Sequence, residues 1–267
     1  MRVIDPAQFY TGLVSLMYGP LRTRADDDVE PCADFIAQAG QPALELGCGD
    51  GYPLLELRER GLDVDGLDSS ADMLARCRAD AAERHLTVTL HHQTMEEMDL
   101  PRSYRAIFLA GPTFNLLPDD RAALRTLERI RDHLAVDGLA RIPLFVPEPA
   151  EADTLGPART HTTLEGEQMR VTAVSQDRDE AARTQSTLLR YELGTADGDV
   201  EVVERPWLLH WYSQNGFREL ASQAGLHVCA ATGPDGAAAT SDDTAFDVIL
   251  ALSGPPTPNR GDAEAGT

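Results

Sequence analysis

The stretch ALELGCGDG, residues 43–51, decides how this chain folds. Its first four residues are typical of a short buried strand. Gly47, Gly49 and Gly51 follow at alternate positions, where a residue without a Cβ lets the backbone turn sharply and approach a ligand. Residues 52–60 then form the expected helix. Such a strand, turn and helix leave free N–H groups at a helix N-terminus, which suit an anionic ligand.

Two classes of ligand use this kind of turn. The dinucleotide fingerprint G-x-G-x-x-G/A needs a third small residue, and Tyr52 stands at that position. The pattern here is E-x-G-x-G-x-G, which resembles motif I of the class I S-adenosylmethionine (SAM)-dependent methyltransferases. The resemblance implies that Glu45, Gly47, Cys48 and Gly49 bind SAM, with the turn beneath its amino-acid end. A turn without a ligand and a nicotinamide-dependent enzyme are the alternatives.

A second strand is expected at 62–68, and it ends in Asp68, 17 residues after Gly51. A carboxylate at this place can accept hydrogen bonds from both ribose hydroxyls. The run D-S-S-A-D-M-L that begins at Asp68 looks like the second motif of the same family, which implies cofactor contacts from Ser69 and Met73. The alternative is that Asp68 only caps the following helix.

The third strand is expected at 86–91. Members of the family often carry an acid and then an apolar residue at the place of Thr94 and Met95, and the acid binds the adenine amino group. Because Thr94 replaces that acid, the resemblance leaves the adenine to backbone groups and to Met95.

The fourth and fifth strands are expected at 106–110 and 138–146, with a helix after Asp119 between them. Ligands of Rossmann-like sheets lie outside the carboxyl ends of the strands. Ala110 and Gly111, which end the fourth strand, should therefore face the SAM methyl group and the acceptor.

Two helices are expected before the first strand, one through Phe9 and Met17 that ends near Tyr18, and one over 28–39. The simpler interpretation is that they cap the sheet. In many small-molecule methyltransferases of this family the N-terminal helices close over SAM and a tyrosine contacts it. The resemblance therefore makes Tyr10 and Tyr18 candidate cofactor contacts.

The alternation of strands and helices stops after Pro147. Alternating residues at 169–175, 187–193 and 200–204, with an Asp-Gly turn before the last run, predict antiparallel strands, and 207–211 predicts one more. We interpret 150–211 as an antiparallel insertion that either covers the pocket or forms a contact in a homodimer.

Candidate acid–base residues follow from the end of this insertion. His210 and Tyr212 share one face of the expected strand, and an imidazole can take a proton near neutral pH. Asn115 could orient an acceptor by hydrogen bonds but cannot act as a base. His161 is a weaker candidate. A histidine with a purely structural role at position 210 stays an alternative.

The composition restricts the partners. The chain has 44 acidic and 23 basic residues, a net charge of −21 and a pI of about 4.6, so it suits neither nucleic acid nor an anionic membrane. No cysteine and histidine spacing predicts a metal site. We see no apolar run long enough to span a membrane and no signal peptide, and we expect a cytoplasmic protein.

These patterns predict an α/β fold: a Rossmann-like class I methyltransferase fold, with a mostly parallel seven-stranded sheet, helices on both faces and an antiparallel insertion after the fifth strand. The predicted organisation is an N-terminal helical cap (1–40), a SAM-binding core (41–149), the insertion over the active site (150–211), a completion of the core (212–253) and a flexible tail (254–267).

The predicted activity is transfer of the SAM methyl group to a small molecule, as in the natural-product methyltransferases that the chain resembles. The sequence does not decide between nitrogen, oxygen and carbon acceptors. The alternative is a SAM-binding protein of this fold that catalyses a cyclisation or a decarboxylation.

Overall fold

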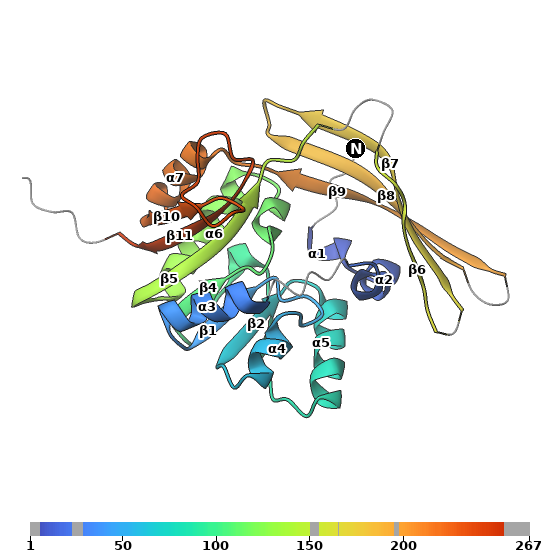
Figure 1. Cartoon of the computed structure of the whole chain (residues 1–267), viewed down its shortest axis with the longest axis horizontal. Helices are drawn as coiled ribbons and strands as arrows, with labels where there is room; N and C mark the ends of the chain where they lie inside the picture. The colour runs from blue at the N-terminus through green and yellow to red at the C-terminus, as the bar shows by residue number, and fades with distance from the viewer. Residues whose placement is uncertain (1–5, 23–28, 150–154, 165, 195–197, 254–267) are drawn as a thin grey trace, which may run out of the picture.

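We describe a computed structural model of the chain (Figure 1), which covers residues 6–22, 29–149, 155–164, 166–194 and 198–253. The predicted tail (254–267), the start of the predicted insertion (150–154) and Asp197 of the predicted turn lie outside these residues. Within them, no helix is both long enough and apolar enough to cross a membrane.

The core is a seven-stranded sheet in the order β10-β11-β5-β4-β1-β2-β3. Only β11 runs antiparallel to its neighbours. The strand order reverses between β1 and β4, which is where ligands of doubly wound sheets bind. The predicted fold class is confirmed. The strands are β1 (Ala43–Leu46), β2 (Val64–Asp68), β3 (Leu90–His92), β4 (Tyr104–Phe108), β5 (Leu134–Phe145), β10 (Leu226–Thr232) and β11 (Ala245–Leu252).

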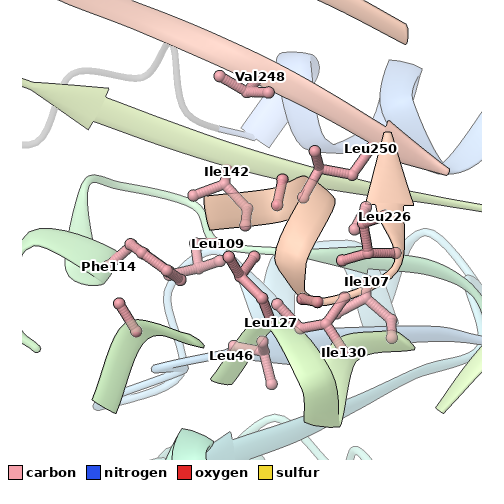
Figure 2. Close-up of a cluster of buried hydrophobic side chains, with 14 of the residues drawn as sticks. Leu46, Ile107, Leu109, Phe114, Leu127, Ile130, Ile142, Leu226, Val248 and Leu250 are labelled. Carbon is pink, nitrogen blue, oxygen red and sulfur yellow. The ribbon is translucent and has the colours of Figure 1, made fainter. Parts of the chain in front are cut away.

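Helices cover both faces of this sheet because alternate side chains of each strand point to opposite faces. On one face, α6 (Asp120–His133) and α7 (Gln214–Gln223) pack against residues such as Leu46 and Ile107 (Figure 2). The other face carries a separate apolar cluster built from α3 (Val29–Ala39), α4 (Leu54–Glu59), α5 (Ala71–Glu83) and the strands.

The second sheet is antiparallel, with four strands in the order β6-β7-β8-β9. It consists of β6 (Arg159–Thr162), β7 (Gln168–Asp179), β8 (Thr184–Gly194) and β9 (Val200–His210). The short helices α1 (Pro6–Phe9) and α2 (Leu13–Leu21) pack on one face of this sheet through a third apolar cluster (Figure 1). Of the helices expected to cap the core sheet, α3 packs on that sheet, whereas α1 and α2 sit against the antiparallel sheet.

Several predicted boundaries were wrong. The single helix expected at the N-terminus is two helices, because Gly12 between them adopts a φ of 56° that helices do not allow. The third strand is only Leu90–His92, and β5 begins earlier, at Leu134. The runs 200–204 and 207–211 belong to one strand that ends at His210, and Pro206 fits within it because β9 pairs with β8 alone and forms a sheet edge.

Candidate cofactor and acceptor sites

The glycine turn after β1 has the backbone that the sequence implied. Gly47, Gly49 and Gly51 have φ values of 72°, 54° and 101°, which L-residues rarely adopt. There is also no room for a side chain at two of them, since a Cβ on Gly47 would lie 2.8 Å from Thr113 Cγ2 and one on Gly51 would lie 2.7 Å from Cys77 Sγ. The glycines are therefore required for the turn itself.

Asp68, at the end of β2, is hydrogen-bonded to the backbone of this turn. Its Oδ2 accepts a hydrogen bond from Gly49 N at 2.8 Å, and its Oδ1 accepts one from Ser70 N at 2.7 Å. Burial raises the pKa of Asp68, while these two hydrogen bonds lower it. Each carboxylate oxygen can accept a further hydrogen bond, so a ribose could still be held here. Ser70 is the N-cap of α5 and accepts from Met73 N.

A small cavity of about 70 Å³ opens at this edge of the core sheet. Thr94 contributes a buried hydroxyl oxygen, Oγ1, that has no hydrogen-bond partner among the described residues. Six residues predicted to bind the cofactor line the cavity together: Tyr10, Gly47, Asp68, Ser69, Thr94 and Met95.

A larger cavity of about 580 Å³ lies between the N-terminal helices and the antiparallel sheet. Tyr10 lines both cavities and so marks the place where they meet. Its segment is fixed to the start of α5, because Ser70 Oγ donates to Tyr10 O at 2.6 Å and Gly12 N donates to Asp72 Oδ2 at 2.7 Å. Burial raises the pKa of the Tyr10 phenol, and a hydrogen bond with Trp207 lowers it.

Tyr18 and Arg22 lie in the wall of the larger cavity. Arg22 Nη1 pairs with Asp50 Oδ1 at 3.4 Å, and its guanidinium carbon lies 4.4 Å from the centre of the Tyr52 ring. Nε and Nη2 of Arg22 are buried and have no hydrogen-bond partner among the described residues. Sequence reasoning missed Arg22, although it follows Tyr18 by four residues, a spacing that brings two side chains together on a helix.

Glu45 lies beneath the turn and is 1% exposed. Its Oε2 has no hydrogen-bond partner within the described part of the chain. Burial, followed by the nearby carboxylates of Asp68 and Glu56, raises the pKa of Glu45 well above its ordinary value. A carboxyl group in this state would be stabilised in its charged form by a bound cation.

Glu45 and Gly49 line neither cavity, and the same holds for the four remaining predicted cofactor residues. Cys48 and Met73 are buried, and Met73 Cε would lie 3.2 Å from a Cβ placed on Gly49. Ala110 and Gly111 follow β4 but are not part of either cavity wall. Of these four residues, Met73 packs against the glycine turn at Gly49.

The predicted acid–base residues lie at the junction of β9 with the core. His210 is 2% exposed, its Nδ1 lies 2.7 Å from Tyr212 Oη, and its Nε2 lies 3.6 Å from Asp120 Oδ1. Burial and the charge of Arg183 lower the pKa of His210. Neither His210 nor Tyr212 is among the described lining residues of these two cavities, so their catalytic role stays a prediction.

Asn115, in the 3-10 helix η3 (Thr113–Leu116), ties two strands together. Its Nδ2 donates to Phe145 O and to His210 O, both at 2.9 Å, and its Oδ1 accepts from Phe145 N at 3.2 Å. Both amide hydrogens are used by backbone carbonyls, and the side chain lines neither cavity. His161 lies on β6 and is exposed. No group of three His, Cys, Asp or Glu side chains suited to a metal ion occurs in the described ranges.

Comparison with known proteins finds methyltransferases among the similar sequences. Residues 43–138 match the family described as a methyltransferase domain. The chain is 28% identical, over 151 residues, to dTDP-3-amino-3,6-dideoxy-alpha-D-glucopyranose N,N-dimethyltransferase of Streptomyces fradiae. That match covers 54% of this chain and 58% of the relative. A match to a protein of Geobacillus sp. named as a methyltransferase is 30% identical and covers 38% of this chain and 41% of the relative.

Solved structures resemble the whole fold. The CcbJ methyltransferase of Streptomyces caelestis has a TM-score of 0.73 at 19% identity, over 93% of this chain and 99% of the other. The sugar N-methyltransferase KedS8 of Streptoalloteichus sp. has a TM-score of 0.68 at 19% identity, over 93% of this chain and 98% of the other. At these identities the likeness establishes the fold, including the antiparallel sheet.

Proposed function

We propose that this chain, whose residues 43–138 match a methyltransferase domain, transfers the methyl group of SAM to an amine of a small-molecule acceptor. Three buried groups without partners among the described residues carry the proposal: a Glu45 carboxylate oxygen, the Thr94 hydroxyl and two Arg22 nitrogens. Buried polar groups normally have hydrogen-bond partners, and these three lie at the glycine turn and in the walls of the two cavities, so a bound ligand is the partner that we propose for them. SAM offers an ammonium, an adenine ring and a carboxylate to match them.

In this proposal each residue has one part of the cofactor to hold. Asp68 accepts hydrogen bonds from the ribose hydroxyls with the lone pairs that the backbone leaves free. Glu45 receives the ammonium, and Arg22 forms charge-assisted hydrogen bonds with the carboxylate. Thr94 and Met95 receive the adenine in the small cavity. When bound, SAM supplies a methyl group on a positively charged sulfur.

The larger cavity favours an acceptor amine in its neutral, nucleophilic form. Its charged lining residues are Arg22 and Arg159, and no Asp or Glu occurs in the described part of its wall. Burial lowers the pKa of an amine, and the described wall has no carboxylate that would stabilise the protonated form. The proton can then leave before the amine enters, so no residue of the cavity has to remove it. The names of the Streptomyces fradiae relative and of KedS8, both N-methyltransferases, also support an amine.

In this proposal the chain accelerates the reaction by orienting the acceptor amine relative to the methyl group of SAM. Tyr10 separates the two cavities, and its segment is held by Ser70 and Asp72, so the acceptor and the methyl group would meet at a fixed place. Holding two reactants about 3 Å apart in line can supply roughly 7–11 kcal/mol of the barrier.

The test is turnover with methyl-labelled SAM and a panel of amino sugars, amino-sugar nucleotides, amino acids and the matching alcohols. The expected result is release of S-adenosylhomocysteine together with a labelled N-methyl product from an amine, and no labelled product from its alcohol. Gly49→Val, which should not bind SAM, is the negative control. Release of S-adenosylhomocysteine with the label only on oxygen would contradict an amine acceptor. Decarboxylation or cyclisation without methyl transfer would contradict the activity.

A further inference from the structure

The charge of the larger cavity is opposite to that of the protein. The chain has 44 acidic and 23 basic residues, yet the charged side chains in the described cavity wall are arginines alone. Arg22 is already paired with Asp50 and stacked on Tyr52. Arg159 makes no ion pair with a described residue and stands beside Tyr191, whose pKa its charge lowers against the larger effect of burial.

The position of Arg159 follows from strand pairing. On β6 it lies directly opposite Val171 of β7, which also lines the cavity, so both side chains belong to the inner face of the sheet. Arg159 is exposed, which places its guanidinium at the open rim. On the other edge strand, Arg205 pairs with the cavity residue Leu189, and its buried Nε has no partner among the described residues.

We propose that Arg159 binds an anionic oxygen group, a carboxylate or a phosphate, on the methyl acceptor. The inference rests on the proposed function, because it assigns the larger cavity to the acceptor. A guanidinium presents two parallel N–H donors that match the two oxygens of either group. With a positively charged rim and no described carboxylate in the wall, the cavity would select acceptors that carry an anion away from the amine.

The experiment titrates the full chain, saturated with S-adenosylhomocysteine so that Arg22 is occupied, with inorganic pyrophosphate and separately with malonate. Tryptophan fluorescence is the readout, since Trp207 lines the cavity. Pyrophosphate tests for a phosphate and malonate for a carboxylate. The variants are Arg159→Gln, Arg159→Lys and the control Arg170→Gln, which removes an arginine from the opposite face of the same sheet, where it pairs with Glu192 at 3.8 Å.

We expect saturable binding of one of the two anions, weakened about tenfold or more in Arg159→Gln and only partly in Arg159→Lys, as for loss of a charge-assisted hydrogen bond. Arg170→Gln should stay within about twofold of the unaltered protein. The proposal is overturned if neither anion binds or if Arg159→Gln binds them equally well. Affinity for S-adenosylhomocysteine, measured in the same samples by calorimetry, tests the proposed function separately: it should be unchanged by Arg159→Gln.

Discussion

The two cavities that meet at Tyr10 are built from opposite chemistry. The smaller one is lined by Asp68 and Glu96, and Glu45 lies beneath its glycine turn. The larger one has arginines and aromatic rings and no carboxylate in its described wall. Carboxylates suit the hydroxyl and ammonium donors of a cofactor, whereas a cavity wall without a described carboxylate suits a neutral amine. Under the proposed function, this difference would divide most cofactor contacts from acceptor recognition, and Arg22 in the wall of the larger cavity would be the exception.

The largest expected effect is a loss of cofactor binding caused by a change in the glycine turn. Gly49→Val should abolish detectable SAM binding in calorimetry, because a branched residue cannot adopt φ 54° without strain and its side chain would press on Met73. Gly61→Val is the matched control, since Gly61 also has a positive φ, 81°, but lies in open space after α4 and outside the glycine turn. Equal loss of affinity in both variants would show that general backbone strain is responsible.

Asp68→Ala should weaken SAM by about tenfold to a hundredfold, because hydrogen bonds to a charged group are worth about 1.5–3 kcal/mol. The same change also frees Gly49 N and Ser70 N. Asp68→Asn keeps one acceptor oxygen and should lose less. A change in the free energy of unfolding without any change in SAM affinity would leave Asp68 as a cap of the turn.

Glu45→Gln tests the cofactor site through the pH dependence of the protein's stability. The folded-state pKa of Glu45 lies well above the ordinary value of 4.5, so the folded state holds a proton that the unfolded chain has lost. The stability of the unaltered protein should therefore fall from pH 4.5 upward, by about 1.4 kcal/mol for each pH unit until the raised pKa is reached.

Glu45→Gln has no such proton to lose, so at neutral pH it should be more stable than the unaltered protein in urea unfolding while it binds SAM more weakly. The difference in stability should vanish below pH 4.5. A variant that is less stable at every pH would indicate that the Glu45 carboxylate is ionised and paired in the protein without cofactor.

The smallest expected effect lies outside both cavities. His210→Ala should change kcat by less than about fivefold, since neutral amines need no base and His210 packs against Tyr212 and Asp120. Tyr212→Phe is the matched control, because it removes the hydroxyl that contacts His210 and keeps the ring. A fall in kcat of about 10²–10⁴-fold with unchanged SAM affinity would establish His210 as the general base.

The sequence predicts the proposed cofactor site much better than it predicts the larger cavity. The glycine turn and Asp68 are local patterns, since the glycines must turn the chain and the carboxylate ends a strand, and both lie where they were expected. Thr94 and Met95 were expected only through the resemblance to the methyltransferase family, and both line the smaller cavity. The core could be predicted because strands and helices alternate along the chain, and each shows a periodic pattern of apolar residues.

The larger cavity could not be predicted in the same way. Its wall depends on which face each long strand turns inward, and the register of β7 and β8 shifts between Ala173 and Ser175. Val171 and Gln185 thus reach one cavity from strands whose alternation alone does not fix the inner face. Arg159 lies on β6, a short strand with no apolar pattern, which is why the sequence did not single it out.

The most direct measurement is a crystal structure of the chain with SAM. We expect the ribose hydroxyls within hydrogen-bond distance of the Asp68 carboxylate, the SAM carboxylate on Arg22, and the methyl group beside Tyr10, directed into the larger cavity. SAM with its adenine among Trp207 and Tyr191 in the larger cavity, or no SAM at saturating concentration, would contradict the division between a cofactor side and an acceptor side.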